Sequence, residues 1–292
     1  MTAYPYQTLD VFTDTRFGGN PLAVVLDADG LSTAQMQAVA REFGYSETTF
    51  VCRATEPGCT HRVRIFTPTF EMPFAGHPNV GTAFALAAMD EGATGFRFQE
   101  IAGPVDVSVR RGSVLETEIA APEPLSTGDG PSVADAAAAL GLAAADVRTD
   151  RHGPTLASVG APFTIVEVAR AALDRAAARD EAGLRAMPGM DAIYAYARGE
   201  APGGEGNGEA LLHARMFFVT DGIVEDPATG SATAAAAALL ASLDGTGRCT
   251  GRFTVRQGEA MGRASTIRVR VEDGRAFVSG TCVPVMRGTL EV

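Results

Sequence analysis

Two short motifs place a glycine and a polar side chain at the expected start of an apolar helix. AGHPNVGTAFALAAM contains Gly76 and His77, and TGSATAAAAALLASL contains Gly230 and Ser231. A helix N-terminus leaves backbone N–H groups unpaired and carries positive partial charge, so it can bind an anion without Lys or Arg. Glycine lets a ligand approach the backbone, and His77 and Ser231 add side-chain donors. Simple helix capping is the alternative reading of each motif.

Two carboxylates are candidates for proton transfer. Glu47 opens the apolar stretch 48–52, and burial beside apolar neighbours would raise the pKa of its carboxyl toward that of a general base. An exposed loop carboxylate is the alternative. Asp226 precedes Gly230 by four residues, and it is either an acid or base at the helix start or an anion that stabilises that start.

Other polar residues stand beside these motifs. Asn20, in the turn RFGGNP, can offer its amide to a substrate or can shape the turn, and we favour the turn. Glu71 and Glu225 stand at corresponding places ahead of the two helices, where each can stabilise the helix start. Gln257 belongs to a compact polar stretch for which turn structure is the simpler explanation.

The elements that carry these residues are arranged as an internal repeat. Each copy runs from a strand with an Arg-x-Phe motif through a short loop to Glu, Pro, Gly and an apolar helix, first over 64–89 and then over 215–243. Neither helix has a polar face, so each should be buried centrally, with short strands wrapped around it. The sequence therefore predicts an α+β fold of two similar domains, each a helix inside a curled sheet.

The remaining pattern supports this plan. Strands are expected at 6–12, 22–26, 46–52, 62–66, 105–110, 114–119, 164–169, 192–197 and 214–219, and helices at 32–44, 132–141 and 170–186. The segment 121–131 has the composition of a linker, and 198–209 that of a Gly/Glu-rich surface loop. We expect domains at 1–122, completed by a C-terminal strand near 284–292, and at 123–283.

Composition excludes several classes of protein. The 292 residues carry a net charge of −11, which argues against binding to nucleic acid or to an anionic membrane surface. No apolar run is long enough to cross a bilayer, and the N-terminus lacks a signal-peptide pattern. The four cysteines form no CxxC pair, so we expect no metal site and a reduced, cytoplasmic setting.

Five stretches together carry a family resemblance: DVFTDTRFGGNPLAVVLDADGL, REFGYSETTFV, RIFTPTFEMPFAGHPNVGTAFAL, EDPATGSATAAAAALL and QGEAMGRAS. In sequence and order they resemble the PhzF-like phenazine-biosynthesis isomerases, which are related in fold to diaminopimelate epimerase and proline racemase. The resemblance covers nearly the whole chain. It implies two similar domains related by a pseudo-two-fold axis, a site in the cleft between them, a homodimer, and a reaction that needs no cofactor.

The resemblance also assigns residues. It makes Glu47 the acid/base, with Asp226 and His77 as further catalytic residues, and it places Gly76, Gly230 and Ser231 in substrate binding. The related racemases use a cysteine at each helix start, whereas this chain has none there, so a thiol mechanism is not expected.

The combined reading is a cofactor-independent isomerase that moves a proton on a small carboxylate. The family's best-known reaction, isomerisation of trans-2,3-dihydro-3-hydroxyanthranilate, is the model for it. Two alternatives stay open: an epimerase or racemase of another amino or hydroxy acid, and a non-catalytic binder of small molecules that kept the cleft.

Overall fold

The chain folds into two compact units, which are described separately. The computed structural model describes residues 2–178, 184–185, 191–200, 209–220, 222–245 and 249–292. Unit 1 comprises Met1–Ala120 and Ser279–Val292, and unit 2 comprises Ala121–Val278. The boundaries therefore fall at 120/121 and 278/279, compared with the expected 122/123 and 283/284.

Unit 1 contains nine strands. They are β1 (Ala3–Val11), β2 (Asn20–Val25), β3 (Glu47–Arg53), β4 (His61–Phe66), β5 (Glu71–Met72), β6 (Gly95–Glu100), β7 (Gly103–Arg111), β8 (Leu115–Ala120) and β18 (Cys282–Glu291). The sheet runs β18-β1-β2-β3-β4-β6-β7-β8, with β5 paired to β4. The β2–β3 and β4–β6 pairs are parallel and the others are antiparallel.

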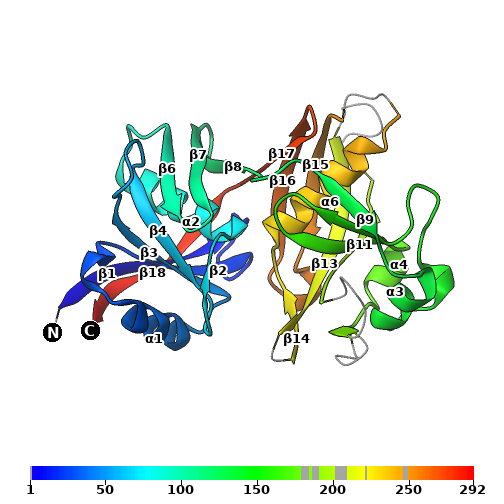
Figure 1. Cartoon of the computed structure of the whole chain (residues 1–292), viewed down its shortest axis with the longest axis horizontal. Coiled ribbons are helices and arrows are strands. Elements are labelled where there is room, and N and C mark those ends of the chain that lie inside the picture. Colours follow the sequence, from blue (N-terminus) through cyan, green and yellow to red (C-terminus); the bar gives the residue numbers. More distant parts are fainter. Residues whose placement is uncertain (1, 179–183, 186–190, 201–208, 221, 246–248) are drawn as a thin grey trace. The chain divides into compact units, whose positions relative to one another are not determined.

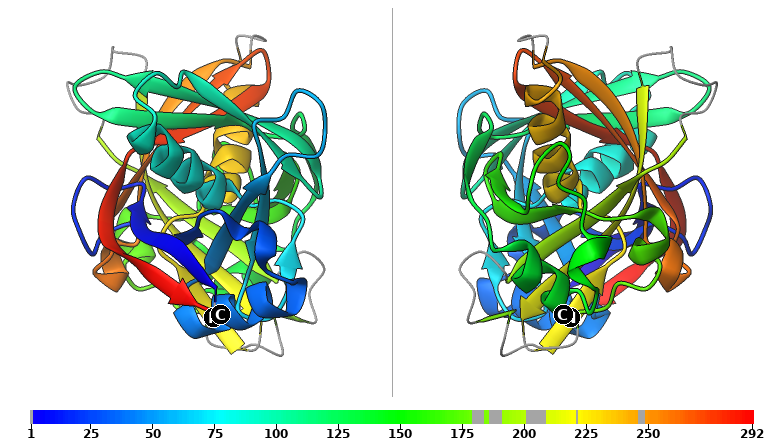
Figure 2. Two further views of the ribbon diagram at one scale, coloured as in Figure 1. Left: turned by 90° about the vertical axis from the view of Figure 1, so that its left-hand side faces the viewer. Right: turned by 90° about the vertical axis from the view of Figure 1, so that its right-hand side faces the viewer.

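Helix α2 (Gly76–Met89) is the centre of unit 1. It contacts β1, β2, β3, β6, β7 and β8, and every residue from 76 to 87 is buried. Figure 1 and the left view of Figure 2 show α2 with strands of unit 1 around it. All sides of the helix contact the sheet, so a helix without a polar face is buried centrally, as the sequence predicts.

A second helix, α1 (Thr33–Phe43), follows the short 3-10 turn η1 (Ala28–Gly30). Ser32 and Gln35 form the predicted capping box, and Gly44 ends the helix in the left-handed conformation with φ of 65°. Met36, Val39 and Ala40 face the core.

Unit 2 repeats the strand pairing of unit 1. Its strands are β9 (Ser126–Asp129), β10 (Thr155–Ser158), β11 (Pro162–Glu167), β12 (Ala192–Arg198), β13 (Glu209–Thr220), β14 (Gly222–Asp226), β15 (Gly251–Gln257), β16 (Ser265–Glu272) and β17 (Arg275–Gly280), the last of which runs into unit 1. The order β9-β10-β11-β12-β13-β15-β16, with β14 on β13, matches β18-β1-β2-β3-β4-β6-β7 with β5 on β4. The parallel pairs, β11–β12 and β13–β15, also fall at the matching places.

Helix α6 (Gly230–Ser242) occupies the place in unit 2 that α2 has in unit 1. It contacts β10, β11, β15 and β16, and almost all of its residues are buried. The described part of unit 2 also contains the helices α3 (Val133–Ala139) and α4 (Arg170–Leu173) and the 3-10 turns η2 (Ala144–Asp146) and η3 (Glu259–Met261). Ser132 caps α3 as predicted, by accepting a hydrogen bond from the Asp135 backbone N–H.

The helix expected over 170–186 is interrupted: 170–173 and 184–185 are helical, but α4 ends at Leu173 and 174–178 are not helical. The Ala177 N–H, which would continue the helix by donating to the Leu173 carbonyl, donates instead to the Leu140 carbonyl at 2.9 Å. The Leu173 carbonyl accepts from the Arg215 guanidinium at 3.3 Å. Tertiary hydrogen bonds therefore replace the helical ones, despite the alanine-rich sequence.

The linker expected over 121–131 is also wrong. The Ala121 N–H donates to the Ala276 carbonyl at 2.8 Å, and residues 126–129 form β9, which pairs with β10. The side chains of β9 are all exposed, so backbone pairing alone forms this strand and the composition gives no apolar signal. Most of the Gly/Glu-rich loop lies outside the described residues. None of the helices in the described part of the chain is long and apolar enough to cross a membrane.

Candidate functional site

Unit 1 brings together Asn20, Glu47 and His77. Asn20 begins β2 and Glu47 begins β3, and these parallel strands are in register with Leu22 opposite Glu47. His77 is the second residue of α2. Adjacent parallel strands start at the same edge of a sheet, so the two strand starts and the helix start meet there.

The three side chains form a chain of polar contacts. Asn20 Nδ2 lies 3.4 Å from His77 Nδ1, and His77 Nε2 lies 3.4 Å from Glu47 Oε2. An amide nitrogen only donates, so Nδ1 accepts and the imidazole proton is on Nε2, which faces the Glu47 carboxyl. On the other side, Ser46 Oγ donates to Asn20 Oδ1 at 3.5 Å and fixes the orientation of the amide.

Burial keeps the His77 imidazole neutral. Desolvation lowers the pKa of His77 from 6.5 to about 3. The His77–Glu47 contact is therefore made by a neutral ring and not by an imidazolium. Glu47 itself keeps 15% of its side chain exposed, so the carboxyl that carries the proposed chemistry is in reach of a ligand.

The start of α2 has no side-chain cap. The N-cap residue Ala75 is extended, with φ of −152°, and its side chain makes no capping hydrogen bond. Gly76 and His77 contribute N–H groups to the first turn, and the His77 side chain lies beside Glu47. An uncapped N-terminus retains its donors and its positive partial charge for an anionic group.

A fourth side chain in unit 1 was not found by sequence reasoning. Glu100, the last residue of β6, is 8% exposed, and neither of its carboxyl oxygens has a hydrogen-bond partner of ordinary geometry. Burial raises the pKa of Glu100 to about 8, and the nearby Asn79 amide of α2 offsets a part of this shift. The Asn79 side chain is itself fixed by a hydrogen bond that Nδ2 donates to the Ala75 carbonyl at 3.0 Å. A lone Glu at a strand end carries no sequence signal for such burial.

Unit 2 brings together Asp226, Thr229 and Gln257. The Thr229 hydroxyl donates to Asp226 Oδ2, and the Thr229 N–H donates to Gln257 Oε1 at 3.2 Å. Gln257 Nε2 donates to the Asp226 carbonyl at 2.8 Å and contacts Thr229 Oγ1 at 3.0 Å. Gln257 is fully buried, so this amide binds the whole turn between β14 and α6. Sequence reasoning left the role of Gln257 undecided and missed Thr229.

The other two predicted residues of unit 2, Gly230 and Ser231, begin α6. Gly230 is buried and Ser231 is partly exposed. The N-cap residue Thr229 makes no side-chain capping hydrogen bond, because its hydroxyl is directed to Asp226. The uncapped helix start thus recurs in unit 2, with Ser231 at the place of His77.

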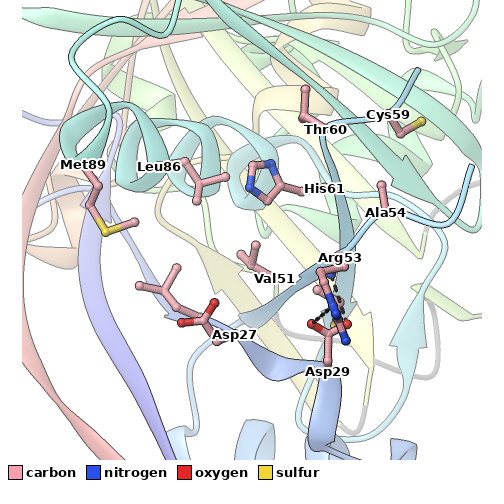
Figure 3. A pocket seen from close by; sticks show the side chains of 12 residues that line it. Asp27, Asp29, Val51, Arg53, Ala54, Cys59, Thr60, His61, Leu86 and Met89 are labelled. Atoms are coloured by element: carbon pink, nitrogen blue, oxygen red, sulfur yellow. Dashed lines mark hydrogen bonds and ion pairs between the residues drawn. The ribbon is translucent and has the colours of Figure 1, made fainter. Parts of the chain in front are cut away.

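A cavity of about 510 Å³ lies elsewhere in unit 1, and the predicted site residues do not line it. Figure 3 shows Asp29 and His61 at its wall, with the ion pair of Arg53 Nε and Asp29 Oδ2 at 3.1 Å. Cys59 also lines it, yet in the described part of the chain no three or more His, Cys, Asp or Glu side chains are grouped to hold a metal ion.

Comparison with known proteins gives the family. Residues 9–288 match the model of the phenazine biosynthesis-like proteins, so the chain belongs to this family. An isomerase of Mesorhizobium japonicum is 40% identical, with 99% of both chains covered. The trans-2,3-dihydro-3-hydroxyanthranilate isomerase of Pseudomonas chlororaphis is 36% identical, with 98% of both chains covered.

Solved structures show the same fold. The PhzF-family phenazine biosynthesis protein of Bacillus anthracis superposes with a TM-score of 0.87 at 24% identity and full coverage of both chains. A hydroxyproline epimerase from Agrobacterium vitis superposes with a TM-score of 0.58 at 14% identity, covering 99% of this chain and 92% of the epimerase. The predicted α+β fold of two similar domains, of the diaminopimelate epimerase type, is confirmed.

Proposed function

We propose that this protein is an isomerase that moves a proton between carbon atoms of a small carboxylate, with Glu47 as the proton shuttle. That it is an isomerase follows from its family and from the isomerase names of relatives 35 to 40% identical to it. The relatives of 35 and 36% identity are named for trans-2,3-dihydro-3-hydroxyanthranilate, and this is the first substrate to test.

The observation that carries the proposal is the contact chain from Asn20 through His77 to Glu47. The neutral imidazole presents its Nε2–H side to the Glu47 carboxyl at 3.4 Å without neutralising it, so Glu47 remains able to accept a proton. In the proposed reaction, Glu47 Oε takes a proton from a carbon of the substrate and returns a proton to another carbon. The electron pair left on carbon shifts within the substrate, so no redox partner is required.

The helix starts supply the proposed binding. The N–H groups at Gly76 in unit 1 suit a carboxylate group, because no side chain caps them and they carry the positive partial charge of the helix start. For unit 2 we propose that Asp226 and Ser231 hold an amine or hydroxyl of the ligand, with the N–H groups at Gly230 as additional donors. We propose that Asn20 acts through His77, because its fully buried amide contacts His77 and Ser46.

Deuterium exchange tests the role of Glu47. The wild type in D₂O should label the substrate at carbon, and Glu47→Gln should lower the turnover by roughly 10²–10⁴, the usual contribution of a positioned acid/base. Ligand affinity should survive, because the N–H donors of α2 are unchanged. Glu42→Gln, an exposed change on α1, is the matched control and should label at the wild-type rate.

Asp226→Asn tests the rival assignment. Exchange that persists in Glu47→Gln and vanishes in Asp226→Asn would reverse the two roles. Labelling accompanied by inversion at one carbon would identify an epimerase, and tight binding without labelling of any carboxylate would identify a binding protein. We also propose that the reaction needs no cofactor or metal, so labelling should continue after dialysis against a chelator. The proposed homodimer is checked by sedimentation.

A further inference from the structure

The same arginine–glutamate pair occurs once in each unit. Arg64 on β4 donates from Nε to Glu71 Oε1 at 2.6 Å and from its terminal nitrogen to Oε2 at 2.6 Å. Arg215 on β13 donates to Glu225 in the same way, at 2.8 and 2.7 Å. The side-chain exposures also agree, at 13% and 19% in the first pair and 14% and 18% in the second.

The surroundings of the two guanidinium groups match as well. Each lies 5.1 Å from the ring centre of the phenylalanine two residues on, Phe66 or Phe217. Each also reaches a helical segment. Arg64 donates to Thr33 Oγ1 of α1 at 3.0 Å, and Arg215 donates to the carbonyls of Leu173, the last residue of α4, and of Ala176 just beyond it. Each arginine therefore links three parts of its own unit: the strand on which it stands, the next strand, which carries its glutamate, and a helical segment.

The position of the two glutamates relative to the helix starts is also the same. Glu71 on β5 and Glu225 on β14 each stand five residues before the first residue of the buried helix, Gly76 or Gly230. Glu225 is moreover the neighbour of Asp226. The ion pair thus anchors the chain immediately before the segments 72–75 and 226–229, which lead to the proposed site residues and make further hydrogen bonds of their own.

Arginine is required for this geometry. Two parallel hydrogen bonds between a planar guanidinium and a carboxylate fix direction as well as distance, which a lysine ammonium cannot do. A partly buried ion pair is weak evidence for stability alone, since apolar side chains of similar volume often serve as well. The pair occurs in both units, at the same distance in sequence from the helix start. This recurrence indicates that the position of the chain before each helix must be fixed.

We propose that Arg64–Glu71 and Arg215–Glu225 are positioning pairs that hold the segments 72–75 and 226–229, and through them set the helix starts for catalysis. The catalytic part of this proposal rests on the proposed function, and the structural part does not. Sequence reasoning treated Glu71 and Glu225 only as anions that stabilise a helix start. In the structure, each is instead the partner of an arginine on the preceding strand.

Hydrogen exchange of the full, ligand-free chain tests the structural part. Arg64→Lys should accelerate amide exchange several-fold in peptides covering 72–79, and Arg215→Lys should do so in peptides covering 226–233, with the rest of each unit unchanged. The matched control is Arg97→Lys, which weakens the exposed pair of Arg97 and Asp106, whose side chains are 47% and 69% exposed. Faster exchange throughout a unit would show a general stability role and overturn the proposal.

Kinetics test the catalytic part. Each Lys variant should lower kcat about tenfold to a hundredfold, because a displacement of about 1 Å at a reacting group costs that much. KM should change less, and Arg97→Lys should match the wild type. The milder variant Glu71→Gln serves if Arg64→Lys does not fold. Combining Glu71→Gln with Arg64→Lys should cost little more than either alone, because both remove one interaction. Additive losses, or unchanged kcat in both units, would overturn the proposal.

Failure of the proposed function has a different signature. A wild type that labels no carboxylate in D₂O would end the isomerase proposal, while local exchange changes in the two Lys variants would still support the positioning pairs. An active wild type with unchanged exchange and kcat in both Lys variants would end only the positioning pairs.

Discussion

Asn20 Nδ2 and His77 Nδ1 lie 3.4 Å apart inside unit 1, although 57 residues separate them in the chain. This contact selects the imidazole tautomer, because a donor amide requires Nδ1 to accept. The proton is consequently on the nitrogen that faces Glu47. The orientation of the buried Asn20 amide thus determines whether an N–H group or a lone pair of His77 faces the Glu47 carboxyl.

Asn20→Asp should reverse this arrangement. A carboxylate at position 20 only accepts, so it favours a proton on His77 Nδ1 and leaves Nε2 as an acceptor facing Glu47. We expect kcat to fall about tenfold or more. Nitrogen-15 spectra of the four histidines report the tautomer directly, and the His77 signals should move while those of His61 stay in place. An unchanged His77 spectrum would contradict the tautomer assigned here.

The neutral His77 should make the fold sensitive to acid. The pKa of His77 is about 3 in the folded chain and 6.5 in the unfolded chain, so between these values only the unfolded chain takes the proton. Stability is therefore lost as the pH falls from 6.5 toward 3, by on the order of 5 kcal/mol in total. Urea unfolding from pH 7 to pH 4 should show this slope in the wild type and a smaller one in His77→Gln. Equal slopes would show that His77 is not the responsible group.

Glu100 should give the stability a pH dependence of the opposite sign. Its carboxyl has a pKa of about 8 in the folded chain against 4.5 in the unfolded chain, so the folded state keeps a proton that the unfolded state releases. Stability then falls as the pH rises from 4.5 to 8, by on the order of 5 kcal/mol. Glu100→Gln should remove this loss and be more stable than the wild type at pH 8. Glu91→Gln, an exposed change in the same unit, should not differ from the wild type.

Gln257→Ala should loosen the turn that carries Asp226. The substitution leaves the buried Thr229 N–H without its acceptor and the Asp226 carbonyl without its donor. We expect a loss of about 2–4 kcal/mol in the free energy of unfolding, together with reduced turnover, because the turn that carries Asp226 loses two buried hydrogen bonds. Gln37→Ala removes a single bond to the Thr67 carbonyl and should cost about 1 kcal/mol or less. Equal effects of the two changes would contradict the special role of Gln257.

The sequence predicted elements whose signal is local. The two central helices were predictable because their apolar residues occupy all sides, and α1 because Ser32, Gln35 and Gly44 mark its ends. The strands with β-branched or alternating residues were predictable for the same reason, because their signal is also local. The continuous helix expected over 170–186 is interrupted because the Ala177 N–H donates to the Leu140 carbonyl, distant in sequence, and Arg215 donates to the Leu173 carbonyl. Propensity contains no information about such a competitor.

The same distinction applies to the candidate site. Glu47, His77 and Asp226 stand in motifs that could be read directly. Gln257 could not be assigned, because its partner Thr229 lies 28 residues away and only the folding of β15 beside the α6 start brings them together. Glu100 was missed for a related reason: burial of a carboxyl at a strand end is decided by the helix packed against it.

The pairing of β1 with β18 has a consequence for how the protein is made. Thr2 and Val292 exchange backbone hydrogen bonds at 3.1 Å, so the two ends of the chain lie side by side in unit 1 (Figure 1). Residues 279–292 leave the ribosome only after all of unit 2 has been synthesised. During translation β1 therefore remains unpaired with β18 while unit 2 can already fold. The unit that begins first is therefore completed only after unit 2, and the framework behind Glu47 is closed at that point.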